Sequence, residues 1–151
     1  MTARPEGARS AEEILGAARA RLARVMPGDA FGELSRGGQL LDIRPAAQRA
    51  GEGEIPGSVV VERNHLEWRL DPECDARLPW VTGYDRVLIV ICQEGYTSSL
   101  AAAALQDLGH ARATDVIGGF RAWAAAGLPT APAGERAAEL APGAAPAADW
   151  P

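Results

Sequence analysis

Cys92 is the residue of this sequence whose position best suits nucleophilic chemistry. It ends the almost unbroken apolar run 86–91 and is followed by the polar segment 93–97 and then by an Ala- and Leu-rich stretch. These patterns predict a buried parallel strand, a short loop and a helix. Such a loop points several backbone N–H groups inward, and the helix dipole adds positive potential. A thiolate or a persulfide held there is therefore stabilised.

Cys92 also has a plainer interpretation, as a small apolar side chain that fills space at the end of a strand. Gly95 favours the reactive interpretation, because a residue without Cβ lets the loop turn tightly around the sulfur. The residues alone leave both interpretations open.

Other reactive side chains form no comparable group. Cys74 lies in a polar, turn-like segment, where it is either a resolving thiol for Cys92 or, as we favour, an incidental loop cysteine. His65 and His110 lack the spacing of metal ligands. We expect His110 to face solvent and His65 to have a surface or capping role. The prediction is therefore a site without metal or cofactor.

The remaining elements must place Cys92 at the edge of a sheet. Ser10 to Glu13 reads as a capping box that starts a helix reaching about Arg21, and Asp29 is expected to cap a second short helix. Strands are predicted at 40–43, 58–61, 86–91 and 113–117, and helices at 98–108 and 118–123. This alternation predicts an α/β fold, with a mostly parallel sheet flanked by helices. We expect Trp68, Trp80 and Trp123 to close the core.

Composition narrows the class of protein. The chain has 151 residues, of which 47% are hydrophobic and 23% charged, and its formal net charge is -5. These values fit one soluble domain and argue against nucleic acid or an anionic membrane as a partner. The N-terminus lacks the apolar segment of a secretory signal, so we expect a cytoplasmic protein whose thiols are free. From about residue 131 the chain is too poor in large apolar residues to build a core.

Three motifs occur in an order that resembles the rhodanese-like domain family. The loop C-Q-E-G-Y-T-S-S at 92–99 resembles the active-site loop of that family. The segments L-L-D-I-R-P at 40–45 and G-E-I-P-G-S at 53–58 resemble its upstream signature, and I-G-G-F-R-A-W-A-A-A-G-L-P at 117–129 resembles its C-terminal signature. The resemblance covers about Arg24 to Pro132.

The resemblance implies a domain organisation and roles for individual residues. Residues 1–22 become an N-terminal helical extension, 23–132 the rhodanese-like domain, and 133–151 a disordered tail rich in Ala and Pro. Cys92 becomes the sulfur acceptor, and Asp42 supports the site. The residues implied to bind substrate are Gln93, Glu94, Gly95, Tyr96, Thr97, Ser98 and Arg44.

The sequence departs from the family pattern in its charges. Active sulfurtransferases of the family usually carry Arg where this chain has Thr97, and the usual His of the upstream signature is Glu54 here. Glu94 adds a negative charge inside the loop. Binding of a dianion such as thiosulfate is therefore expected to be weak, unless Arg44, Arg63 or Arg121 compensates.

Three functions compete at this stage. The first is a sulfurtransferase or sulfane-sulfur carrier that acts through a Cys92 persulfide, with a small sulfur donor and a thiol, cyanide or protein acceptor. The second is a rhodanese-like module that binds or regulates a partner with little catalysis. The third, a phosphatase or arsenate reductase on a related fold, requires an arginine in the loop, and neither Thr97 nor Ser98 supplies one.

Overall fold

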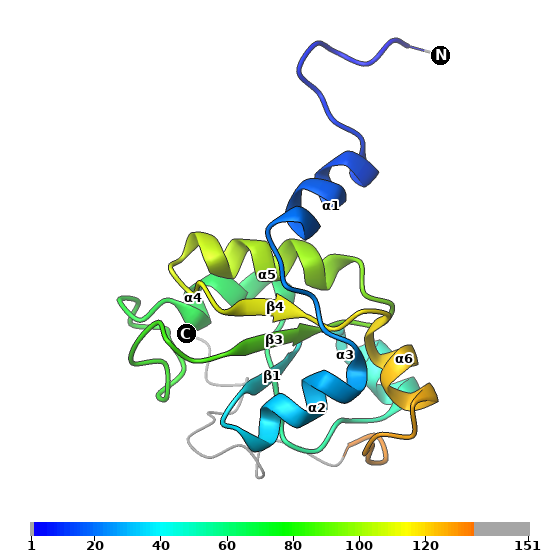
Figure 1. Ribbon diagram of the computed structural model, residues 1–151, viewed down its shortest axis with the longest axis vertical. Helices are drawn as coiled ribbons and strands as arrows, with labels where there is room; N and C mark the ends of the chain where they lie inside the picture. Colours follow the sequence, from blue (N-terminus) through cyan, green and yellow to red (C-terminus); the bar gives the residue numbers. More distant parts are fainter. Residues whose placement is uncertain (1, 135–151) are drawn as a thin grey trace.

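A four-stranded parallel sheet with the order β2-β1-β3-β4 lies at the centre of the structure, and helices cover both of its faces (Figure 1). The computed structural model describes residues 2–134. The elements are α1 (Ala11–Ala20), α2 (Pro27–Ser35), β1 (Gln39–Asp42), α3 (Ala46–Glu52), β2 (Ser58–Val60), the 3-10 turn η1 (Arg63–His65), α4 (Leu66–Leu70), β3 (Leu88–Ile91), α5 (Thr97–Asp107), β4 (Ala113–Asp115) and α6 (Gly119–Ala125). The α/β fold predicted from the sequence is confirmed.

The central strand β3 explains why residues 86–91 are apolar without alternation. Its side chains point to opposite faces in turn, and each face is covered. Leu88 and Val90 pack in the cluster that includes α4 and α5, whereas Ile89 and Ile91 pack with α2 and α6. Cys92 continues the alternation and joins the cluster beneath α5.

The N-terminal segment is fastened to the domain by its helix and by the chain that follows it. The capping box is confirmed, because the Glu13 N–H donates to Ser10 Oγ at 3.0 Å and the Ser10 N–H donates to Glu13 Oε1 at 3.1 Å. These bonds, together with Arg4, lower the pKa of Glu13. Helix α1 packs on α5, and Val25 pairs with Val116 beside β4 (Figure 1). The segment before α2 thus contacts α5 and the chain just after β4, the elements next to the loop that contains Cys92.

Several local expectations were wrong. Helices α3 and α4 were not predicted, because both are short and α3 has neither a side-chain cap nor a buried face. Asp29 does not cap α2. The cap is Met26, and Pro27 occupies the first helical position, where no N–H is needed. The predicted tail lies outside the described residues from residue 135 onward.

Two aromatic side chains also lie where they were not expected. His110 is only 2% exposed, and its Nε2 lies 2.6 Å from the carbonyl oxygen of Leu70, because the turn after α5 folds back onto α4. Trp68 is 53% exposed on α4 and does not close the core, whereas Trp123 is fully buried.

Candidate functional site

Cys92 sits at the carboxyl end of β3, where the chain enters the loop that precedes α5. Its Sγ accepts a hydrogen bond from the Gly95 N–H at 3.2 Å, so the loop folds back over the sulfur. The turn depends on Gly95, whose φ is +89°, and a Cβ built there would lie 2.8 Å from the Gly118 nitrogen. Glycine is required both by the left-handed conformation and by this close approach.

The backbone at the start of α6 is hydrogen-bonded to the loop that contains Cys92. The Phe120 N–H donates to the Cys92 carbonyl at 2.7 Å, and the Arg121 N–H donates to the Gln93 carbonyl at 3.1 Å. Gly119, with φ of +61°, passes so close that a Cβ would lie 2.6 Å from the Cys92 carbonyl oxygen. The I-G-G-F segment therefore fixes the backbone on which Sγ is carried.

Cys92 lines a pocket of about 270 Å³, together with Ile43, Arg44, Pro45, Gln48, Gln93, Glu94, Tyr96 and Thr97. Most of the residues expected to bind substrate thus lie around one opening. Two of them lie elsewhere. Gly95 contacts Sγ through its N–H but is not part of the pocket lining, and Ser98 is buried with its hydroxyl donating to Asp115 Oδ2 at 2.7 Å.

Arg44 lines the pocket, but its charge is committed to carboxylates. Its side chain is buried, with Nη2 2.6 Å from Asp42 Oδ2 and Nη1 3.3 Å from Glu52 Oε1. Burial disfavours the charged guanidinium, but bonds to Asp42 and Glu52 outweigh it and raise the pKa of Arg44. The guanidinium carbon also stands 4.1 Å from the Phe120 ring centroid. Arg44 is therefore held in place by its ion pairs beside the pocket and does not offer a free cation to an anionic donor.

The rim of the pocket carries polar and negative groups. Gln93 donates to Glu52 Oε2 at 3.0 Å and accepts from Gln48 at 3.3 Å. Glu94 forms an exposed ion pair with Arg121 at 3.2 Å. Thr97 is the exposed first residue of α5. Glu54, at the position of the family's usual histidine, is buried against Arg49 and does not line the pocket.

Beneath the loop lies a hydrogen-bonded group that sequence reasoning missed. Asp115, fully buried at the end of β4, accepts from Ser98, from Ser99 and from Arg24. Arg24 also donates to the Gly95 carbonyl at 3.1 Å, and Arg19 donates to the same oxygen at 2.7 Å. Asp115 could have been suspected as an acidic residue at the carboxyl end of a strand beside β3.

No sequence signal marked the two arginines, since both precede the family resemblance or stand at its edge. Arg63, one of the three arginines expected to compensate for Thr97, pairs with Glu67 at 2.9 Å and is not part of the pocket lining. Cys74 is half-buried and free, and its Sγ accepts from the Ala76 N–H at 3.4 Å. Nothing in this geometry assigns it a role beside Cys92.

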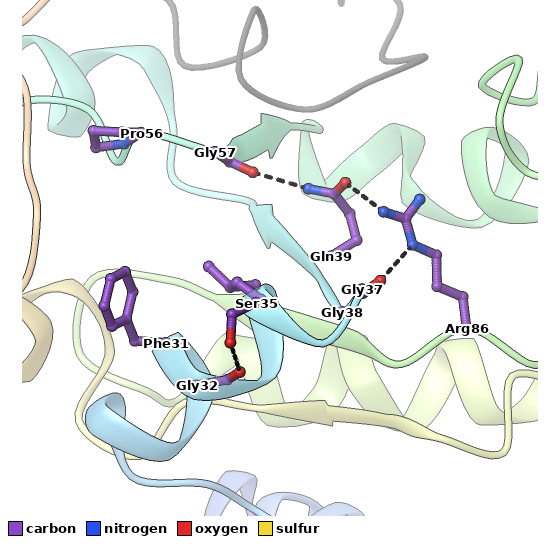
Figure 2. Close-up of a pocket in the computed structure, with 10 residues that line it drawn as sticks. Phe31, Gly32, Ser35, Gly37, Gly38, Gln39, Pro56, Gly57 and Arg86 are labelled. Carbon is purple, nitrogen blue, oxygen red and sulfur yellow. Dashed lines mark hydrogen bonds between the residues drawn. The ribbon is translucent and has the colours of Figure 1, made fainter.

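A larger cavity, of about 550 Å³, lies at the opposite end of the sheet, where β1 and β2 begin (Figure 2). Gln39 bridges its walls, donating to the Gly57 carbonyl at 3.1 Å and accepting from Arg86 at 3.3 Å. We favour the smaller pocket as the reactive site, because it contains the thiol and lies at the carboxyl ends of the strands.

Two negative findings concern residues 2–134. No group of three His, Cys, Asp or Glu side chains is arranged to hold a metal ion in this part of the chain. Within the same range, no helix combines the length and apolarity needed to cross a bilayer.

Curated relatives include sulfurtransferases. The chain is 35% identical over 90 residues to a sulfurtransferase of Allochromatium vinosum, a match that covers 60% of this chain and 75% of the relative. It is 36% identical over 96 residues to the adenylyltransferase and sulfurtransferase UBA4 of Lodderomyces elongisporus, covering 59% of this chain. That match spans only 20% of the relative's length.

Solved structures share the fold. A protein of unknown function from Rhodopseudomonas palustris, described as a possible tyrosine phosphatase, superposes with a TM-score of 0.75 and 29% identity, covering 85% of this chain and 99% of that one. The human single-domain sulfurtransferase TSTD1 superposes with a TM-score of 0.57 and 25% identity, covering 68% and 95%. The rhodanese-like domain family itself matches residues 28–126, and the chain therefore belongs to that family.

Proposed function

We propose that this protein is a sulfurtransferase or sulfane-sulfur carrier that works through a persulfide on Cys92. The observation that carries the proposal is the position of Cys92, whose Sγ accepts the Gly95 N–H at 3.2 Å and which lines a pocket of about 270 Å³. Family membership and sulfurtransferase relatives support it.

The proposed reaction has two displacement steps. The Cys92 thiolate attacks the sulfane sulfur of a donor, an S–S bond forms, and the donor's remaining part leaves with the electron pair of the broken bond. A thiolate acceptor, cyanide or an acceptor protein then attacks the outer sulfur of the persulfide and regenerates the Cys92 thiolate. Neither step needs a metal or a cofactor. The protein supplies the Gly95 N–H as a donor to the sulfur, and the loop before α5 keeps Sγ in place.

The pocket favours a donor of low charge over thiosulfate. Within its lining, Arg44 is the single cation, and that cation is already paired with Asp42 and Glu52. Thr97 adds no charge, and Arg121 does no more than offset the negative Glu94 with which it pairs. Bringing a dianion to this opening is electrostatically unfavourable. Uncharged or thiol-bound donors, such as a persulfide of a small thiol or of a partner protein, do not meet this penalty.

A second candidate is a rhodanese-like module that binds a partner without appreciable sulfur transfer. The exposed Thr97, at the position where active family members usually carry Arg, is the observation that favours it. The two functions differ in one measurable property, namely whether Cys92 accepts and releases a sulfur atom.

Mass spectrometry of the intact protein after incubation with sulfur donors tests the proposal. We expect a mass gain of one sulfur atom that maps to Cys92, is removed by cyanide, and is lost in the Cys92→Ser variant. Cys74→Ser is the matched control and should load normally. A protein that stays unmodified with thiosulfate, a small-molecule persulfide and a polysulfide would contradict sulfur transfer and favour the binding module.

A further inference from the structure

The N-terminal segment reaches the reactive loop from outside the region that the family matches. That region begins at residue 28, whereas Arg19 belongs to α1 and Arg24 to the connection that follows it. Both guanidinium groups donate to the Gly95 carbonyl, at 2.7 Å and 3.1 Å. The N–H of the same residue is the donor to Cys92 Sγ. Two positive groups therefore hold the residue that contacts the sulfur.

The two arginines differ in how their charge is used. Arg24 pairs with the fully buried Asp115 at 2.8 Å, so this pair is close to neutral as seen from the loop. Arg19 instead bonds neutral partners, with Nε 3.1 Å from Ser99 Oγ and Nη2 on the Gly95 carbonyl. Within the described residues it makes no ion pair with a carboxylate. Its guanidinium carbon also lies 5.6 Å from the ring centroid of Tyr96, which lines the pocket.

Charges around the loop show what Arg19 adds. Arg121 offsets Glu94 and Arg24 offsets Asp115, whereas the single cation Arg44 is shared by two carboxylates, Asp42 and Glu52. Four carboxylates thus meet three guanidinium groups, and the set is one unit negative without Arg19. The half-buried position of Arg19 limits screening of its charge by solvent.

We propose that Arg19, from outside the active-site loop, supplies part of the positive charge that Thr97 does not, and that it thereby raises the rate of Cys92 with anionic reaction partners relative to neutral ones, without reversing the preference of the pocket for uncharged donors. The use of this effect of Arg19 to select sulfur donors rests on the proposed function. The electrostatic effect on the Cys92 thiol exists whether or not the protein moves sulfur. In this proposal Arg19 is a positioning and specificity residue, since it acts on the sulfur through Gly95 and through its field.

Paired alkylating reagents test the proposal without any sulfur donor. In a Cys74→Ser background Cys92 is the one remaining thiol, and its rates with anionic iodoacetate and neutral iodoacetamide can be compared. We expect Arg19→Gln to lower the iodoacetate rate by about fivefold while the iodoacetamide rate changes little. Arg19→Lys should restore most of the rate ratio, and salt near 1 M should reduce it in the unmutated protein.

Arg112→Gln is the matched control. Arg112 also donates to a backbone carbonyl, that of Asp85 at 2.9 Å, but it stands just before β4 at the opposite end of the sheet from Cys92. Its loss removes the same charge and should leave the ratio of the two rates unchanged.

Three results would overturn the inference. One is an unchanged rate ratio in Arg19→Gln, and another is an equal fall of both rates, which would mean that Arg19 does not discriminate between anionic and neutral partners. The third, which applies even if the variants fold poorly, is a salt-independent ratio in the unmutated protein. Failure of sulfur loading with a normal Arg19 effect would contradict the proposed function and leave this inference standing.

Discussion

At the scale of single residues, the site combines a well-supported thiol with an unusual distribution of charge. The hydrogen bonds that hold Cys92 come from the backbone: the Gly95 N–H donates to Sγ, and the Phe120 N–H donates to the Cys92 carbonyl and fixes the backbone that carries the sulfur. The Gly95 donor is fixed by the fold and needs no reorganisation when an anion forms on Sγ. In the proposed function, the side chains around the opening decide which sulfur donor can approach.

The first prediction therefore concerns Thr97. Replacing it with Arg places a guanidinium at the exposed start of α5, beside the pocket, where it can pair with an anionic donor. We expect Thr97→Arg to raise kcat/KM for thiosulfate by roughly tenfold or more. The rate with a neutral sulfur donor should change much less, so the ratio between donors is the quantity to measure.

Thr82→Arg provides the control for this substitution. Thr82 is also exposed, but it lines a separate cavity near the start of β3. The substitution therefore adds the same charge at a position away from the Cys92 pocket. A comparable rise in thiosulfate turnover in Thr82→Arg would mean that net charge alone was limiting. Fast thiosulfate turnover by the unmutated protein would contradict the charge argument at Thr97.

At the scale of elements, the loop after β3 and the turn before α6 form one interlocked unit. Gly95 approaches Gly118, and Gly119 approaches the Cys92 carbonyl, so neither turn can move alone. Gly95 and Gly119 have positive φ values, +89° and +61°, at which any side chain would add strain. The unit explains why motifs some 25 residues apart in the sequence belong to one site.

The second prediction tests this interlock with Gly119→Ala. Its Cβ would lie 2.6 Å from the Cys92 carbonyl oxygen, a backbone atom that can move only if the loop moves. We expect a loss of about 1–3 kcal/mol in the free energy of unfolding. We also expect a marked fall in the alkylation rate of Cys92, because the loop that carries it must shift. Chemical denaturation and alkylation kinetics measure the two effects.

Gly16→Ala is the matched control within the same chain. Gly16 lies inside α1 without positive φ, and a Cβ there meets nothing within 4 Å. The change should raise stability by up to about 1 kcal/mol and leave Cys92 reactivity unaltered. If Gly119→Ala were as harmless as Gly16→Ala, the close approach would have no mechanical importance.

The helices and strands show which parts of the structure the sequence could predict. The strong signals were the continuous apolar strand before Cys92, the capping box at Ser10 and the glycine pairs, and each corresponds to an observed element. Helix α3 was missed, and with it the contributions of Gln48 and Glu52 to the site. The Arg19 contact with Gly95 joins residues 76 positions apart. Only tertiary packing of α1 on α5 creates it, so no local pattern could reveal it.

At the scale of the whole molecule, the sheet separates two apolar layers that share its strands. One layer lies under α4 and α5 and includes Cys92, and the other lies under α2 and α6 around Trp123. Strand β1 places Leu41 in the first layer and Leu40 in the second, and both side chains are fully buried. If the sheet couples the layers, damage to either one should destabilise the entire domain, the reactive loop included.

The third prediction compares Leu40→Ala with Leu41→Ala, a pair that removes the same atoms from neighbouring positions of one strand. Each should lower the free energy of unfolding by about 2–5 kcal/mol. In both variants the far-UV circular dichroism and tryptophan fluorescence transitions should shift together, because a single cooperative unit unfolds. Protection of Cys92 from alkylation should be lost at the same denaturant concentration. Separate transitions in Leu40→Ala, with Cys92 still protected after the fluorescence of Trp123 has changed in a background where the other three Trp are replaced by Phe, would show instead that the α2–α6 layer can open without the α5 layer. The thiol would then be insulated from damage on the opposite face, and the coupling that we infer from the shared strands would be wrong.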